Sequence, residues 1–308
     1  MAMMKATGIT KDFSAREQLF FAIFLMVICM IASGVLITFF KYLGNIESDD
    51  ITKYSARHIV IFRYIQMSST LISFGLPAVL FGLFYTNNIK KYFAVVPPQD
   101  MRWYLLAPVL LLSILPIIKS LSDINKGIHL PASMIDIEQA LRSLEHKLMQ
   151  YVLVFLKDKS PITFAVNVFM IALLPAICEE LFFRGVVQRI AYQVFDNFHA
   201  AILFAAAIFA AIHVEFFSFL PLFALGILLG YLYYYSGSLL LPMAFHFINN
   251  AFTVTAIYIM VLKNQDVSLD GSSYPWYMMA LSVIFFVSTF SFFVHAAQHF
   301  KQKHKNHI

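Results

Sequence analysis

Several side chains that can do chemistry lie inside long apolar runs, where a charge costs roughly 2.5–3.5 kcal/mol on insertion scales. Such residues face a bundle interior or a water-filled cavity, so a functional use is the first hypothesis. They fall in three short stretches, CEELFFRG at 178–185, FAAIH at 209–213 and HFINN at 246–250. The residues of interest are Glu179, Glu180, Arg184, His213, His246, Asn249 and Asn250.

The first stretch combines two carboxylates with a base one helical turn later. Glu180 and Arg184 are spaced i,i+4 with the acid first, which is the favourable order for an ion pair on a helix. Glu179 is rotated by about 100° from Glu180 on such a helix, so one acid can be structural while the other serves chemistry. The alternative is a wholly structural charge cluster that fixes helix packing.

A hairpin brings the second stretch to the depth of the first. The turn-like sequence Asp196–Phe198 follows Glu179 by about 17 residues and precedes His213 by about as many, so each lies ~25 Å from the turn if helix continues to about residue 195. His246 and Asn250 share a helix face, one turn apart, while Asn249 lies on a neighbouring face. Counted in residues from the Ser236–Gly237 turn, His246 lies nearer to its turn than Glu179 does to the Asp196 turn. Direct contact between the two therefore requires helix tilt.

Together these groups suffice for peptide hydrolysis. A carboxylate can take a proton from water, a histidine can share that duty or protonate the leaving amine, and a second histidine with an amide can stabilise an oxyanion. Equally, Glu179, His213 and His246 form an N/O ligand set of the kind that catalytic zinc sites use. The helical HExxH signature of zinc proteases is absent, since His213 is followed by VEFF.

The composition says which elements must hold these residues. The chain is 60% hydrophobic and only 13% charged, with a mean hydropathy of +0.75, against about 25% charged residues in an ordinary globular domain. The sequence therefore predicts an all-α polytopic transmembrane helical bundle and excludes a nucleic-acid-binding domain. About eight runs approach the length of roughly 20 apolar residues that spans a bilayer. They are Leu19–Phe40, Ile59–Tyr85, Trp103–Ile118, Ile162–Leu181, Phe198–His213, Phe216–Tyr235, Leu239–Leu262 and Trp276–Val294.

We expect one integral membrane domain over residues 1–308, with the chemistry in core helices at 160–255. The connection at 119–160 has apolar residues at helical spacing, which predicts an amphipathic helix that lies at the membrane interface or packs on neighbouring loops. An even number of spans puts both termini on one side. Basic residues near both ends and in the loop before Trp103 predict that this side is cytoplasmic. They are Lys5, Lys11, Arg16, Lys90, Lys91, Arg102, Lys301, Lys303 and Lys305, against Asp266 and Asp270 opposite.

The three stretches resemble the motifs of the CPBP family, the CAAX-protease and bacteriocin-processing (Abi) family of intramembrane endopeptidases. Glu179, Glu180 and Arg184 match EExxxR, FAAIH matches FxxxH, and HFINN matches HxxxN. The intervening ALGILLGYLYYYSGSLLLPMAFH is similar to the Gly-rich helix, turn and following helix of that family. The resemblance covers roughly residues 160–255.

The resemblance implies a type II CAAX prenyl endopeptidase-like enzyme in the cell membrane. By carry-over, Glu179 and His213 activate water, His246 and Asn250 form an oxyanion site, and Glu180 and Arg184 support them. The expected partners are membrane lipid and a peptide or protein substrate, including lipidated ones, with no nucleic acid. We favour a glutamate-type mechanism without a cofactor, because Asn250 supplies an amide where a third strong ligand is expected, and keep zinc on Glu179, His213 and His246 as the alternative.

Two other classes of function remain open. One is a non-catalytic membrane scaffold or immunity protein with the same fold, against which the intact motifs count. The other is a proton-coupled transporter, because an intramembrane Glu/His/Arg cluster also suits a proton relay. Transporters often carry internal repeats, and none is evident in the sequence.

Overall fold

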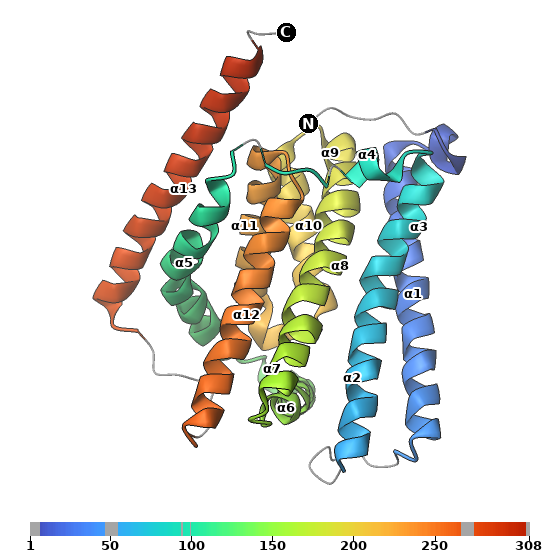
Figure 1. Cartoon of the computed structure of the whole chain (residues 1–308), viewed down its shortest axis with the longest axis vertical. Coiled ribbons are helices and arrows are strands. Elements are labelled where there is room, and N and C mark those ends of the chain that lie inside the picture. The colour runs from blue at the N-terminus through green and yellow to red at the C-terminus, as the bar shows by residue number, and fades with distance from the viewer. Residues whose placement is uncertain (1–6, 47–54, 94, 99, 266–273, 306–308) are drawn as a thin grey trace.

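The computed structural model describes residues 7–46, 55–93, 95–98, 100–265 and 274–305, and within these ranges it contains helices and no strand. Figure 1 shows most of the helices running side by side. Lys5, Asp266 and Asp270, used above for orientation, lie outside the described residues, as do the side chains of Lys90, Lys91, Lys301, Lys303 and Lys305.

The N-terminal helices form one side of the bundle. After a 3₁₀ turn, η1 (Ile9–Asp12), helix α1 (Ala15–Leu43) begins at a capping box in which Ser14 accepts from Glu17 N and Glu17 accepts from Ser14 N. The second span is continuous through α2 (Ala56–Thr70), the π-helical η3 (Leu71–Gly75) and α3 (Leu76–Tyr85). A short helix, α4 (Ile89–Phe93), follows.

Helix α5 is longer than predicted. It was expected at Trp103–Ile118 and extends over Trp103–Lys126. The added turns are polar, and an i,i+4 ion pair between Lys119 and Asp123 stabilises them. A 3₁₀ turn, η4 (Ala132–Met134), then leads into the amphipathic helix α6 (Ile135–Leu156).

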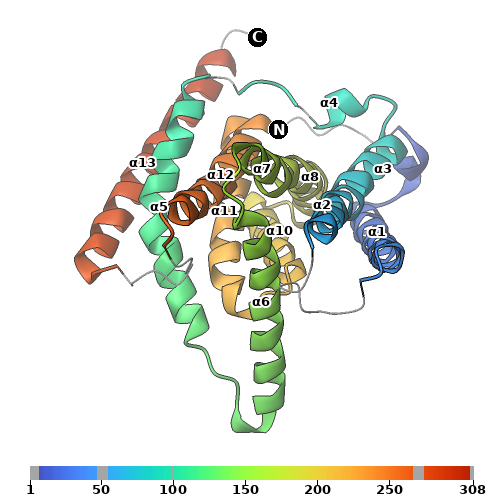
Figure 2. The same ribbon diagram turned by 60° about the horizontal axis from the view of Figure 1, so that its bottom comes forward.

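Helix α6 crosses the direction of the spans at one end of the bundle, where Figures 1 and 2 show it beneath α7 and beside the end of α5. Ile137, Leu144 and Leu148 are exposed, as a helix at the interface requires, while Phe155 is buried. Phe155 and Leu156 at its end pack against the bundle, and the location of its exposed face at the membrane interface stays a prediction.

The next span is a single helical segment from Pro161 to Phe195, which we call the 161–195 helix. It consists of α7 (Pro161–Asn167), the π-helical η5 (Val168–Leu173), α8 (Leu174–Phe182), the π-helical η6 (Phe183–Gln188) and α9 (Arg189–Phe195). It ends at the predicted turn, where Asp196 adopts a left-handed conformation with φ 47°. Asn197 then caps the following helix by accepting from two backbone N–H groups.

Four further helices complete the chain: α10 (Phe198–Ile212), α11 (Phe219–Ser236), α12 (Leu240–Leu262) and α13 (Trp276–Lys305), with a 3₁₀ turn, η7 (Phe216–Ser218), before α11. Within the described ranges, seven helices are long and apolar enough to span a membrane, and α10 is a shorter apolar helix of 15 residues. The predicted count of eight is met only if α10 is included.

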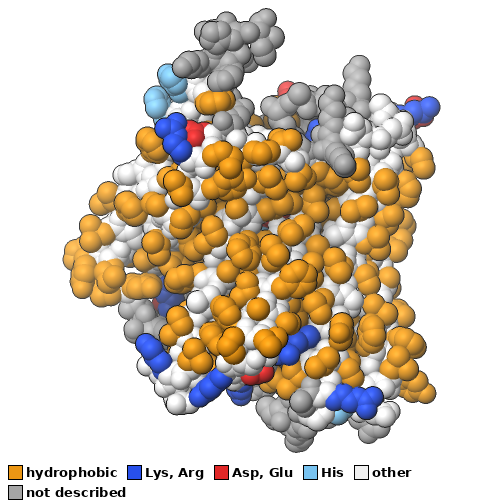
Figure 3. Space-filling model, in the orientation of Figure 1, with side chains coloured by type: hydrophobic (Ala, Val, Ile, Leu, Met, Phe, Trp, Pro, Cys, Tyr) orange, Lys and Arg blue, Asp and Glu red, His pale blue; other side chains and the backbone are white. Residues whose placement is uncertain are grey.

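Figure 3 shows apolar side chains over most of the visible face and Lys and Arg gathered toward its two ends. The start of α1 and the end of α13 lie at the same end of the bundle, as an even number of crossings requires (Figure 1). The chain is a multi-pass membrane protein.

Two apolar clusters position the polar residues. One joins α1, α3 and α10 to the 161–195 helix and includes Phe182, Phe183 and Phe209. The other joins α5, α11, α12 and α13 and includes Phe245, the neighbour of His246. The buried polar residues of the three stretches therefore lie inside the bundle rather than on a lipid-facing surface; they are Glu179, Glu180, Arg184 and His246.

Candidate functional site

The two glutamates lie in the interior of the 161–195 helix. Glu180 has no exposed surface and Glu179 is 7% exposed. Both belong to α8, which is flanked by the two π-helical segments η5 and η6. Single π-helical turns inside α-helices occur frequently at functional sites.

Arg184 is paired with Glu180, as the i,i+4 spacing predicted. Arg184 Nη1 donates to Glu180 Oε1 at 2.7 Å, and both side chains are at most 1% exposed. The other terminal nitrogen, Nη2, donates to the carbonyl of Gly226 at 3.0 Å. Glu180 is thereby fixed by a fully buried, charge-assisted contact, which is the stronger class of hydrogen bond.

The contact with Gly226 was not foreseen from the sequence. Gln188 repeats it one turn later by donating to the carbonyl of Gly230 at 3.1 Å. A Cβ at Gly226 would lie 2.9 Å from Ala206 Cβ, so the glycine lets α10 and α11 approach closely. The signal was present as the two glycines spaced four apart in ALGILLG.

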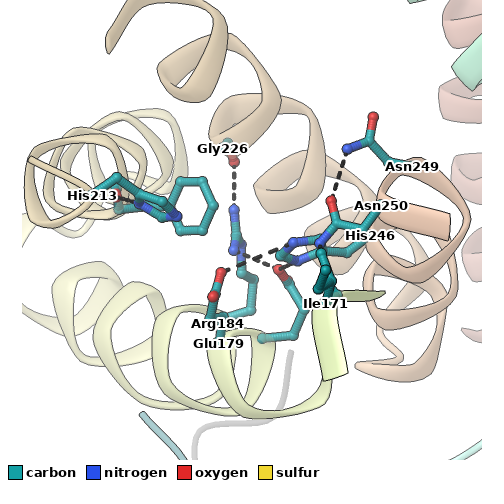
Figure 4. Close-up of polar contacts among 10 residues, drawn as sticks. Ile171, Glu179, Arg184, His213, Gly226, His246, Asn249 and Asn250 are labelled. Atoms are coloured by element: carbon teal, nitrogen blue, oxygen red, sulfur yellow. Dashed lines mark hydrogen bonds and ion pairs between the residues drawn. The ribbon is translucent and has the colours of Figure 1, made fainter. Parts of the chain in front are cut away.

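His246 contacts both glutamates from α12. Its Nδ1 lies 3.0 Å from Glu180 Oε1, and its Nε2 lies 3.9 Å from Glu179 Oε2 (Figure 4). Because an ionised carboxylate only accepts hydrogen bonds, Nδ1 carries the proton in the contact with Glu180. His246 therefore reaches Glu179 although it lies near the Ser236–Gly237 turn, and Nε2 is the nitrogen directed at Glu179.

The two carboxylates have different surroundings. Glu180 Oε1 accepts from both Arg184 and His246. No hydrogen bond to the Glu179 carboxylate is found among the described residues, and its ion-pair contact is the one with His246. Glu180 Oε2 and Arg184 Nε are buried without a hydrogen-bond partner in the part of the chain that is described. Within the described residues, Glu180 is therefore held by two hydrogen bonds, and the carboxylate of Glu179 is left to act on a ligand.

Asn250 lies one turn after His246 on α12, as predicted. Its Nδ2 donates to the carbonyl of Ile171 at the long distance of 3.4 Å, and its Oδ1 accepts from Asn249 Nδ2 at 3.1 Å. Figure 4 shows the two asparagines side by side, next to His246. The weak bond to Ile171 leaves the amide of Asn250 able to turn toward a ligand.

His213 lies at the end of α10, and its Nδ1 contacts the carbonyl of Phe209 at 2.6 Å. The ring of Phe209 is 4.7 Å from that of His213 and 6.2 Å from that of His246, so it neighbours both histidines. Figure 4 shows His213 set apart from the other labelled residues. No hydrogen bond or ion pair joins it to Glu179 within the described ranges, so the predicted meeting at a shared water stays a prediction.

The geometry bears on the zinc alternative. Among the described residues, no three His, Cys, Asp or Glu side chains are gathered as a metal site requires. Glu179 and His246 are close enough to share an ion, but His213 does not join them in a ligand group within the described ranges. The residues as arranged do not fit a three-ligand zinc site, and no step below is assigned to a metal.

Comparison with known proteins supports the resemblance drawn from the motifs. Residues 161–252 match the family described as type II CAAX prenyl endopeptidase Rce1-like. The uncharacterized protein YpbD of Bacillus subtilis (strain 168) is 28% identical over 210 residues, which are 66% of this chain and 91% of that protein. No solved structure gives a match. The expected family resemblance is confirmed over residues that include all three motifs, and it suggests a protease-type hydrolase.

Proposed function

We propose that this chain is an intramembrane endopeptidase that hydrolyses a peptide bond of a membrane-associated protein or peptide. The observation that carries the proposal is the unequal environment of two adjacent acids. Glu180 is held by Arg184 and His246, whereas Glu179 has no hydrogen bond among the described residues. A pair of titratable groups in contrasting environments is typical of acid–base catalysis.

Glu179 is the general base in this proposal. Its carboxylate takes a proton from water, and the resulting hydroxide oxygen attacks the carbonyl carbon of the scissile bond. The carbon–nitrogen bond of the tetrahedral intermediate then breaks as Glu179 returns the proton to the leaving amine. The atoms and charges balance with water as the only co-reactant, as hydrolysis requires.

His246 and Asn250 stabilise the oxyanion. The Nδ1 contact with Glu180 fixes the imidazole, and with a proton on each ring nitrogen Nε2 donates to the developing oxyanion. The Asn250 amide exchanges its 3.4 Å contact with Ile171 for one with the developing negative charge. Donors placed before the reaction starts are most effective in a buried site, because they need little reorganisation.

His213 completes the site when substrate binds. Its Nδ1 is committed to Phe209, so Nε2 is the nitrogen that faces water or substrate. Catalytic contacts are often long in the absence of substrate and shorten in the complex. The proposed cycle therefore includes a closure step, in which His213 moves toward Glu179 and helps it orient water.

The substrate class follows from the family and the setting. The matching family is named for prenyl endopeptidases, and we propose a peptide or protein substrate carrying a lipid group. We propose that it lies in the cell membrane with both termini in the cytoplasm, which the basic residues near its ends support. No cofactor is assigned to the reaction.

Cleavage of a peptide library by the purified chain tests the proposal. The library should contain matched peptides with and without a prenylated cysteine, and product masses should be read by mass spectrometry. Wild type should cleave at least one peptide at a defined bond, and Glu179→Ala should cleave none. Equal products from wild type and Glu179→Ala would reject the assignment of Glu179.

A further inference from the structure

The turn after His213 has a strained backbone. Val214 adopts a left-handed conformation with φ 56°. For a β-branched residue this is a strained outlier that persists only where the surrounding structure holds it. The strain lies directly beside a proposed catalytic histidine, so the contacts that hold the turn are of functional interest.

Asn125 holds this turn from the last residues of α5. Its side chain is 2% exposed and uses both ends of its amide. Nδ2 donates to the carbonyl of Phe216 at 3.0 Å, and Oδ1 accepts from Leu220 N at 2.7 Å. One amide thus bridges Phe216, the first residue of the 3₁₀ turn η7, and Leu220 in the first turn of α11, and so holds the segment that follows the His213 turn.

Helix α6 holds the same turn from a second direction. Glu145 Oε1 accepts from Phe217 N at 2.8 Å, and the Arg142 guanidinium lies 3.7 Å over the Phe217 ring. Arg142 is itself fixed by Glu138 at 2.9 Å. The backbone at Phe217 is therefore attached to a helix whose own position is set by a further ion pair.

Apolar packing does not fill this region. A cavity of about 470 Å³ lies between the end of α5, α6 and the turn, and Asn125, Leu141, Val214 and Glu215 are among its lining residues. With open space beneath the turn, van der Waals contacts fix it less firmly than in a close-packed core. The polar contacts of Asn125 and Glu145, together with the buried Phe217 side chain, therefore supply the constraint.

We propose that Asn125 and Glu145 are positioning residues for His213. They do not touch the reacting atoms; they hold the strained turn so that the imidazole stays at the depth of the site. The role rests on the proposed peptidase function. It assigns a part in catalysis to α5 and α6, which precede the region that matches the family.

Kinetics give the first test. Asn125→Ala and Glu145→Ala should lower kcat by roughly 10- to 100-fold, the range caused by small misplacements of catalytic groups, with KM changed by less than about twofold. Glu145→Gln keeps an oxygen that accepts from Phe217 N and should retain most of the wild-type kcat. Equal losses in Glu145→Gln and Glu145→Ala, or changes confined to KM, would overturn the proposal.

Asn167→Ala is the matched control. Asn167 is also 2% exposed, and its amide donates to the Phe155 carbonyl at 2.7 Å, away from the His213 turn. It should lower thermal stability as Asn125→Ala does, without the loss of kcat. If Asn125→Ala does not accumulate, the half-buried Glu145 carries the test with its own pair of variants.

A spin label at the turn gives a readout that needs no substrate. Val214→Cys places a thiol at a side chain that is 55% exposed, whereas Cys29 and Cys178 are buried. Asn125→Ala and Glu145→Ala should increase the mobility of the label, and Asn167→Ala should not. Unchanged mobility would overturn the positioning role, whereas absence of cleavage by wild type with increased label mobility would reject the peptidase function alone.

Discussion

His246 is bound to Glu180 across the helix interface, with Nδ1 3.0 Å from Oε1. This contact joins the third motif to the first and orients the other imidazole nitrogen toward Glu179. A carboxylate that orients a histidine in this way fixes which nitrogen acts on the substrate. The two glutamates therefore have separable roles, and mutations should distinguish them.

Replacing each glutamate by glutamine should give opposite patterns. Glu179→Gln should fold normally and lose turnover by about 10²–10⁴-fold, as expected for loss of a general base. Glu180→Gln should lower stability, because Arg184 is left as a buried charge without its counter-ion. Thermal unfolding in detergent and single-peptide kinetics measure both effects. Equal stability losses in the two variants would contradict the division of roles.

Arg184→Ala should destabilise the protein by about 3–5 kcal/mol, because it leaves the buried Glu180 carboxylate without its charged partner. Arg184→Lys should recover only part of this loss. A lysine cannot reproduce the fork that donates to both Glu180 and Gly226. Denaturant or thermal unfolding of the purified variants provides the measurement, and wild-type stability in Arg184→Ala would rule out the supporting role.

Asn250→Ala should lower kcat by roughly 10²–10³-fold with little change in substrate binding, as loss of one oxyanion donor does. Asn249→Ala is the neighbouring control. It removes only the contact to Asn250 Oδ1, so its effect on kcat should be much smaller. Steady-state kinetics of the two variants on one cleaved peptide decide the matter, and similar losses would argue against a direct role for the Asn250 amide.

Activity should survive exhaustive chelation. The proposed mechanism uses only side chains and water, so treatment with EDTA and phenanthroline should leave kcat unchanged. Elemental analysis of active protein should show no stoichiometric zinc. Loss of activity on chelation with recovery on adding zinc would require the set Glu179, His213 and His246 to rearrange around an ion at about 2.0–2.2 Å.

Stability should fall in acid through Glu138. The Leu130 N–H, followed by Arg142, lowers the pKa of Glu138 to about 2 from an ordinary 4.5. The folded state therefore favours the ionised form, and this stabilisation is present above pH 4.5 and lost as the pH falls from about 4.5 toward 2. Thermal unfolding from pH 7 to about pH 3 should show a smaller acid loss in Glu138→Gln than in wild type.

Local patterns predicted much of the molecule. Apolar runs located the spans because a bilayer demands about 20 apolar residues in a helix. The turn at Asp196 and the pairing of Glu180 with Arg184 followed from turn chemistry and helical spacing. Helix ends were less predictable, since α5 continues through polar residues to Lys126.

Contacts between helices were harder to derive. Counting depth treats helices as parallel rods, and so it could not show that His246 reaches Glu180. It also could not show that the Phe209 ring would neighbour both His213 and His246. Such contacts depend on the tilt and close approach of helices, and the glycines at 226 and 230 mark a place of close approach without naming the side chains that meet there.

The paired contacts of Arg184 with Gly226 and of Gln188 with Gly230 restrict how this chain can change in length. The two donors are four residues apart, and so are the two acceptors. The two contacts therefore form only when both helices keep the same register along this turn. One residue inserted between Arg184 and Gln188 would turn every later side chain by roughly 100° and remove the second contact. A compensating insertion between Gly226 and Gly230 would be needed in the same lineage. Substitutions can accumulate in this pair of helices, but insertions and deletions should be confined to the loops at their ends.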